Sequence, residues 1–215
     1  MKPILIDGCC GAGGLTRGYQ NAGFYVIGVD IEPMPNYVGD EFYQDDALDF
    51  IDKNWRDADG VHISPPCQLY SKTHRINKQQ APDLIAPARE LLQTMTVPWV
   101  IENVPDSPLI DPVELCGAMF GLFTYRHRLF ESSFDLEAPV HPEHRWRNAK
   151  MGRMPKPGEF MHVVGHYSGA KQARVAMGID WMTREELAEA VPPAYSEYVG
   201  IQLLNVLNTP LEVAA

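Results

Sequence analysis

The residue best suited to covalent chemistry is Cys67, which follows Pro65 and Pro66 in the segment VHISPPCQLYS. The apolar run before it predicts a buried strand, and a free cysteine with a packing role usually lies inside such a run. Two prolines restrict the backbone ahead of the thiol, and cysteine is a strong nucleophile even when little of it is thiolate. We therefore expect Cys67 to react, the alternative being a buried structural thiol.

A second segment, DGCCGAGG near the N-terminus, has the composition of a ligand-binding loop. Gly11, Gly13 and Gly14 allow a tight turn and close backbone approach at a helix N-terminus. Asp30, 19 residues after Gly11, could accept hydrogen bonds from ribose hydroxyls, and Asp46 could accept one from an adenine amino group. The order G-x-G-G departs from the dinucleotide pattern, and one ribose, one adenine and no phosphate suit S-adenosylmethionine better than NAD. A plain structural turn is the alternative.

These segments need strands and helices to hold them in place. The pattern of apolar residues in the first 130 residues predicts such elements. Short apolar runs predict buried strands at 4–6, 25–29, 61–63 and 98–101. Between them, helical patterns occur at 15–21, 47–53 and 84–95. Buried strands alternating with helices indicate a parallel, doubly wound α/β sheet. Ligands of such sheets bind beyond the carboxyl ends of the strands, so DGCCGAGG, DIEP, SPPCQ and ENVP should face one crevice.

The rhythm breaks between about residues 132 and 179, which are rich in Pro, Gly, His and Arg. This stretch predicts an inserted loop region or small subdomain. Regular structure should return at Thr183, which has capping-box spacing to Glu186. A last helix is expected at 194–207, with apolar residues at 195, 199, 203 and 206.

Composition limits the class of protein. The 215 residues, 45% of them hydrophobic, suit one globular domain. No apolar run of about 18 residues predicts a membrane span, and four cysteines without a signal sequence or a C-x-x-C pair indicate a reducing cytoplasm and no metal. Although the net charge is −10, residues 124–174 hold nine Lys/Arg against five Asp/Glu. That basic segment is compatible with nucleic-acid binding; a solvated loop is the alternative.

Taken together, DGCCGAGG, SPPCQLYS, IENV, YRHRLF and VPPAYSEYVG resemble, in order and spacing, the sequence blocks of DNA (cytosine-5)-methyltransferases. The match covers roughly residues 3–131 and 183–207, and the compact length is similar to that of small phage-type members. The resemblance implies a Rossmann-like, S-adenosylmethionine-dependent methyltransferase fold with a short inserted recognition region. It divides the chain into a catalytic and cofactor-binding core (1–131), an inserted DNA-recognition region (132–182) and C-terminal helices that complete the core (183–215).

The resemblance also implies a role for each catalytic residue. Cys67 would add to carbon 6 of cytosine, and Glu102, with a pKa raised in a dry site, would donate a proton to ring nitrogen 3. Asn103 would shape the loop. Arg126 and Arg128 are expected on one face of a strand, Arg128 at the cytosine carbonyl and Arg126 near a phosphate or the thiol. The alternatives are a surface or N-cap role for Glu102 and a salt-bridged arginine pair.

The remaining implied contacts are with the cofactor and with double-stranded DNA, from which the target cytosine is flipped out. The expected cofactor-binding residues are Asp7, Cys9, Gly11, Ala12, Gly13, Gly14, Asp30, Ile31, Asp46, Ala47 and Pro66. The expected DNA-binding residues are Gln68, Ser71, Arg145, Arg147, Lys150 and Arg153. The chain departs from the family pattern at Thr124, where Gln is usual, at Glu189, where Asn is usual, and in its short insert.

Two other functions remain open from the sequence. The first is the same chemistry on a free cytosine nucleotide or on RNA, which the acidic total charge favours and the basic segment opposes. The second is a DNA-binding or cofactor-binding relative without turnover, which the joint presence of Cys67, Glu102 and Arg128 opposes. For a phage-encoded enzyme the compartment would be the host cytoplasm.

Overall fold

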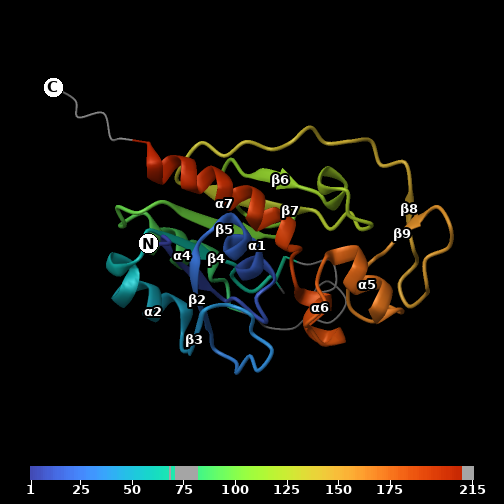
Figure 1. The fold of residues 1–215 in the computed structure, drawn as a ribbon, viewed down its shortest axis with the longest axis horizontal. Helices are drawn as coiled ribbons and strands as arrows, with labels where there is room; N and C mark the ends of the chain where they lie inside the picture. The colour runs from blue at the N-terminus through green and yellow to red at the C-terminus, as the bar shows by residue number, and fades with distance from the viewer. Residues whose placement is uncertain (68, 71–81, 210–215) are drawn as a thin grey trace.

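A mixed seven-stranded sheet forms the centre of the protein (Figure 1). The computed structural model describes residues 1–67, 69–70 and 82–209. The strand order is β3-β2-β1-β4-β5-β7-β6. The strands are β1 (Ile4–Gly8), β2 (Tyr25–Asp30), β3 (Glu41–Gln44), β4 (Gly60–Ile63), β5 (Trp99–Asn103), β6 (Val113–Leu115) and β7 (Arg128–Ser132). From β3 to β5 every pair is parallel, whereas β7 is antiparallel to both of its neighbours.

Helices cover both faces of this sheet (Figure 1). They are α1 (Gly14–Ala22), α2 (Ala47–Asn54), α4 (Ile85–Leu92) and α7 (Pro193–Asn208), with short 3-10 helices η1 (Trp55–Asp57) and η2 (Gly117–Phe120). One hydrophobic cluster joins α2, η1 and α4 to the sheet, and a second joins α1 and α7 to its other face. The predicted doubly wound α/β architecture is therefore confirmed.

Each strand and helix predicted in the first 130 residues is present, with boundaries within about three residues. The sheet is mixed, however, because β7 runs antiparallel at the end that holds β6. The last helix also differs from expectation. Tyr195, Val199 and Leu203 are fully buried, but Val206 is 38% exposed because it lies in the final turn of α7, beyond the sheet.

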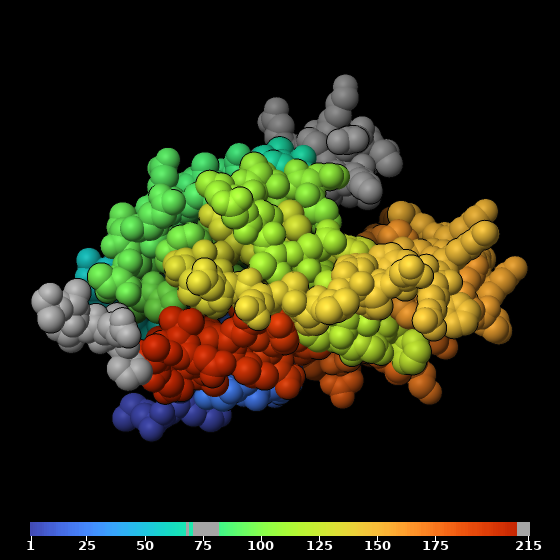
Figure 2. Space-filling view, turned by 90° about the horizontal axis from the view of Figure 1, so that it is seen from above, coloured from blue at the N-terminus to red at the C-terminus, as the bar shows by residue number. Residues whose placement is uncertain are grey.

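Residues 133–146 form an extended strap without regular structure that runs along α7 (Figures 1 and 2). In Figure 2 this yellow segment lies between the green β6–β7 region and the red α7. Paired hydrogen bonds join the strap to α7: Glu137 N donates to Gln202 Oε1 (2.9 Å), and Gln202 Nε2 donates to the Glu137 carbonyl (3.1 Å). The chain thus returns from the sheet edge to the insert across the surface of the core.

Beyond the strap, the insert contains regular structure that the sequence did not predict. β8 (Arg147–Asn148) and β9 (Glu159–Phe160) form a two-stranded parallel sheet, followed by α5 (Ala170–Met177). The sequence did not predict the eight-residue helix α5 because its hydrophobic periodicity is weak. Gly169 and Gly178, both with left-handed backbones, lie at its two ends. α5 packs with α6 (Arg184–Glu189) in a third hydrophobic cluster that includes Ala12 of the N-terminal loop. The proposed boundary at 182 therefore falls between two helices of one cluster.

Within the described residues, no helix combines the length and the apolar character that crossing a membrane requires.

Candidate active site

The segments predicted to share a crevice follow β1, β4 and β5, which are parallel neighbours and end at one edge of the sheet. Cys67 follows β4, and Glu102 and Asn103 close β5. β7 runs the other way, with Asn103 opposite Leu129 in the register. The first residue of β7, Arg128, is therefore at the edge where β5 ends, and antiparallel pairing brings it to the predicted acid and nucleophile.

The Pro-Pro-Cys loop is attached to β5 by a buried side chain. Asn103 Nδ2 donates to the Pro65 carbonyl at 2.8 Å, while Asn103 Oδ1 accepts from Val104 N at 2.9 Å. After the cysteine, Tyr70 N donates to the Cys67 carbonyl at 3.0 Å. The Asn103 side chain thus links the end of β5 to the loop that carries Cys67, and Cys67 is half-buried.

Charges around the thiol act in opposite directions. Burial raises the pKa of Cys67 above its ordinary value, Arg128 and Arg126 lower it, and Glu102 raises it further. The net effect is upward, so the thiol is mostly protonated near neutral pH. Arg128 and Arg126 nonetheless lie close enough for their positive charges to favour the thiolate.

Glu102 is 4% exposed and faces Arg128, whose Nε lies 3.0 Å from Glu102 Oε1. Burial raises the pKa of Glu102, and this outweighs the lowering by Arg128, by a hydrogen bond from Ser64 and by Arg126. The short contact with Arg128 is not aligned as a hydrogen bond, and Oε1 has no hydrogen-bond partner in the described part of the chain. Burial thus favours the protonated form of this carboxyl, which can present its proton to a ligand.

Arg126 contradicts the expectation of an arginine pair on one strand face. It precedes β7 and has a left-handed backbone, with φ of 33°. Its guanidinium donates to the carbonyls of Val163 and, at 2.8 Å, Ala188. Burial and the like charge of Arg128 lower the pKa of Arg126 to about 9. Backbone carbonyls of the insert and of α6 therefore hold the Arg126 guanidinium, while its charge still lowers the pKa of Cys67.

A buried polar chain behind Glu102 was missed in the sequence. Tyr19 Oη lies 2.8 Å from His62 Nδ1, and His62 Nε2 lies 3.1 Å from Ser64 Oγ. Burial lowers the pKa of His62 to about 3, so the ring is neutral. Ser64 in turn hydrogen-bonds Glu102. The only sequence signal for this series of hydrogen-bonded side chains was a polar residue, His62, between the apolar Val61 and Ile63.

The N-terminal loop has the backbone geometry expected of a ligand cradle. Cys9, Gly11 and Gly13 have positive φ values of 56°, 52° and 84°. A Cβ built on Gly11 would meet no atom within 4 Å, so space is open above this backbone. Trp181 closes the loop from the insert, because its indole Nε1 donates to the Ala12 carbonyl at 2.9 Å.

Asp7 supplies the polar group that tests whether a cofactor fits. Its carboxyl is 1% exposed; Oδ2 accepts from Thr16 Oγ1 at 2.6 Å, whereas Oδ1 has no hydrogen-bond partner among the described residues. Burial raises the pKa of Asp7 to about 7. Buried polar atoms in native proteins almost always have a hydrogen-bond partner. A buried carboxyl oxygen without one, at the end of the strand that leads into the glycine loop, suits the cationic S-adenosylmethionine.

The two acidic residues expected at ribose and adenine have backbone partners. Asp30 Oδ2 accepts from Gly11 N at 2.9 Å, and Asp30 Oδ1 accepts from Glu32 N at 3.1 Å. Asp46 Oδ1 caps α2 by accepting from Leu48 N and Asp49 N. Each carboxylate oxygen accepts more than one bond, so both groups keep capacity for a ligand.

Other expected cofactor residues differ in their surroundings. Gly14 begins α1, and a Cβ there would lie 2.5 Å from the Val191 carbonyl. Helix packing thus explains this glycine without any ligand. Ile31 is 66% exposed just beyond β2, and Ala47 is buried at the start of α2. Pro66 is half-buried, and burial raises the pKa of Cys9 to about 12, which keeps that thiol neutral.

The predicted DNA contacts fall into three groups. Gln68 and Ser71 lie outside the described residues. Arg145, Arg147 and Lys150 are exposed on the insert around β8. Arg153 is instead paired with Glu159, to which its Nη2 donates at 2.8 and 2.7 Å, so its charge is already compensated.

Comparison with known proteins yields structural rather than sequence matches. No protein-family model and no curated protein matches the sequence. Among solved structures, an E. coli prophage-encoded protein assigned as a DNA modification methyltransferase superposes with a TM-score of 0.67 at 17% identity, covering 97% of this chain and 100% of that one. The S. pombe Dnmt2 methyltransferase superposes with a TM-score of 0.65 at 14% identity and the same coverage. The protein therefore has the α/β, Rossmann-like fold of S-adenosylmethionine-dependent methyltransferases.

Proposed function

We propose that the protein transfers a methyl group from S-adenosylmethionine to carbon 5 of cytosine in DNA, through a covalent Cys67 adduct. One observation carries this proposal: Cys67, Glu102 and Arg128 converge at the edge of the sheet where the glycine loop of β1 also ends. A nucleophile, a buried acid and a cation beside a cofactor cradle are what carbon-5 methylation of a pyrimidine needs.

The proposed chemistry follows from the weak nucleophilicity of carbon 5. The Cys67 thiolate adds to carbon 6, and Glu102 delivers its proton to nitrogen 3, so the ring becomes an electron-rich enamine at carbon 5. Arg128 stabilises the adduct at the cytosine carbonyl and the thiolate before addition. Bound S-adenosylmethionine supplies the electrophilic methyl group. The nitrogen-3 proton then returns to Glu102, a water molecule accepts the carbon-5 proton, and the Cys67 thiolate is expelled, which restores the aromatic ring.

Asn103 and Arg126 have positioning roles in this proposal. The bond from Asn103 to the Pro65 carbonyl fixes the approach of Cys67. Arg126 binds carbonyls at Val163 and Ala188, so it fixes the insert and α6 against the site. Its charge still favours the Cys67 thiolate. The cofactor would be held by the loop from Asp7 to Gly13, together with Asp30 and Asp46.

Double-stranded DNA is the proposed substrate because the insert presents cations that form no ion pair with any residue the structure describes. Arg145, Arg147 and Lys150 are exposed on one short segment, where they can bind phosphates. A free nucleotide would need no such surface. The E. coli structural neighbour, assigned to DNA modification, supports the same substrate. The target base must leave the stack for Cys67 to reach carbon 6.

The proposal is tested by covalent trapping. Duplex DNA containing 5-fluorocytosine is incubated with the protein and S-adenosylmethionine, then run on a denaturing gel. Fluorine at carbon 5 blocks the final elimination, so an active enzyme stays bonded to its DNA. We expect a shifted band that Cys67→Ser abolishes and that peptide mapping places on Cys67.

Parallel reactions separate the other functions. An adduct with fluorinated RNA or a fluorinated nucleotide, but not with duplex DNA, would transfer the same chemistry to that substrate. DNA retention on a native gel without any adduct would identify a non-catalytic binding protein. Either result would overturn the proposed function.

A further inference from the structure

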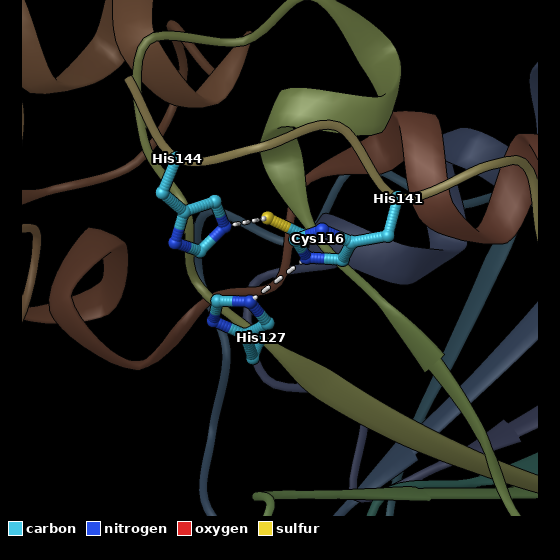
Figure 3. Close-up of side chains that lie close together, drawn as sticks. All are labelled: Cys116, His127, His141 and His144. Carbon is cyan, nitrogen blue, oxygen red and sulfur yellow. Dashed lines mark hydrogen bonds between the residues drawn. The ribbon is translucent and has the colours of Figure 1, made fainter. Parts of the chain in front are cut away.

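Four side chains that could ligate a metal lie close together beside the start of β7 (Figure 3). Cys116 caps η2, His127 directly precedes β7, and His141 and His144 belong to the strap of residues 133–146. Their ligand atoms, one sulfur and three nitrogens, all lie within 4.8 Å of one another. Three segments distant in the sequence therefore offer four donors to one point.

The spacing of the donors matches a tetrahedral site. His127 Nε2 lies 3.2 Å from His141 Nε2, and His144 Nε2 lies 3.4 Å from Cys116 Sγ. Zinc–nitrogen and zinc–sulfur bonds of about 2.0 and 2.3 Å at tetrahedral angles place nitrogens about 3.3 Å apart and nitrogen about 3.5 Å from sulfur. The side chains thus need only small adjustments to surround one ion.

Groups around the cluster orient the donors. His141 Nδ1 lies 2.9 Å from the Pro142 carbonyl. Only an N–H can donate to that oxygen, so Nε2 keeps its lone pair toward the cluster. A hydrogen bond from the other ring nitrogen orients metal-binding histidines in the same way. The Tyr125 ring stacks on His144 with centroids 3.6 Å apart, and Glu114 Oε1 lies 3.9 Å from His127 Nε2. A cation here would meet both ordered rings and a neighbouring carboxylate.

We propose that Cys116, His127, His141 and His144 bind one Zn²⁺ ion that fastens the strap to the core sheet. This inference is opposite to the absence of a metal expected from the sequence, and it does not depend on the proposed catalytic activity. All four positions are taken by protein, so the site is closed and structural in kind. Through His127 the ion would also fix the start of β7, whose first residue, Arg128, contacts Glu102 in the candidate active site.

Metal content is the direct test. The full-length protein is loaded with Zn²⁺, separated from free ion by gel filtration and analysed by elemental mass spectrometry. We expect about one zinc per chain in the wild type, and loss of most of it in His141→Ala. His141 is exposed, so this variant should fold. His166→Ala, an exposed insert histidine outside the cluster, is the matched control and should keep its zinc.

A cobalt-loaded sample tests the ligand set. Co²⁺ in a tetrahedral site with a thiolate should show a sulfur-to-metal charge-transfer band in the near ultraviolet, absent from Cys116→Ser. A chelator should lower the melting temperature of the wild type and of His166→Ala, but not that of His141→Ala. A wild type that emerges without zinc, or zinc retained equally by His141→Ala and Cys116→Ser, would overturn the proposal.

Discussion

The side chain of Asn103, the last residue of β5, donates a 2.8 Å hydrogen bond to the carbonyl of Pro65, two residues before Cys67. The bond is buried, so its loss would leave a carbonyl without a partner and free the loop that carries the thiol. We expect Asn103→Ala to destabilise the protein by about 1–3 kcal/mol and to slow formation of the Cys67 adduct.

A second variant, Asn103→Asp, separates the two hydrogen bonds of this side chain, because it keeps the acceptor for Val104 N but loses the donor to the Pro65 carbonyl. It should slow adduct formation as well. Denaturant unfolding and the rate of trapping on 5-fluorocytosine DNA measure the two effects separately. A full trapping rate in both variants would rule out a role of Asn103 in positioning Cys67.

Glu102 gives a prediction on rate and its pH dependence. Glu102→Gln keeps the shape but cannot deliver the proton, so trapping should slow by roughly 10²–10⁴-fold. Burial raises the pKa of Glu102, and the acid works only while protonated, so wild-type trapping should lose rate as the pH rises through that raised pKa. The variant should lack this decline with rising pH; the same pH profile in both proteins would exclude Glu102 as the acid.

Asp7 should make stability depend on pH. Its pKa rises from 3.8 to about 7 on folding, so the folded state holds this proton more tightly than the unfolded state does. The resulting stabilisation is complete below about pH 4 and is lost as the pH rises toward 7. Asp7→Asn, which stays neutral, should show a flatter decline of melting temperature across this window. An unchanged slope would show that Asp7 does not titrate there.

Arg89 and Glu131 form a buried ion pair that concerns stability alone. Arg89 Nε and Nη2 both donate to the Glu131 carboxylate at 2.7 Å, with side chains 13% and 6% exposed. Removing one partner leaves a buried charge, so Arg89→Ala should cost about 3–5 kcal/mol in denaturant unfolding. The exposed pair of Lys53 and Asp49, at 3.9 Å, is the control, and Lys53→Ala should change stability by under about 1 kcal/mol. Equal effects would contradict the assigned difference in burial.

The insert cations predict how DNA binding responds to salt. Replacing Arg145, Arg147 and Lys150 together by Ala should weaken binding to duplex DNA and reduce the slope of log affinity against log salt by up to about 3. Arg153→Ala should change the slope less, because Glu159 already pairs with that charge. Filter binding across a salt series measures both, and a larger change in Arg153→Ala would reverse the assignment.

Local patterns in the sequence determined the scaffold. Apolar runs and turn residues predicted the strands at 4–6, 25–29, 61–63 and 98–101 and the helices between them, because hydrophobic periodicity depends on near neighbours. The capping box of Thr183 and Glu186 begins α6 as predicted. Since parallel strands end at a common edge, the same patterns also placed the Cys67 loop, Glu102 and the glycine loop at one edge of the sheet.

What only the tertiary structure decided is contact between distant segments. The antiparallel pairing of β7 brings Arg128 to Glu102, and carbonyls at Val163 and Ala188 hold Arg126 off the strand. Cys116, His127, His141 and His144 meet because the strap folds back over the core, which no spacing in the chain reveals. Local sequence fixes backbone preferences over a few residues. Which side chains finally touch depends on how the whole chain packs, and the chemistry of this protein depends on those contacts.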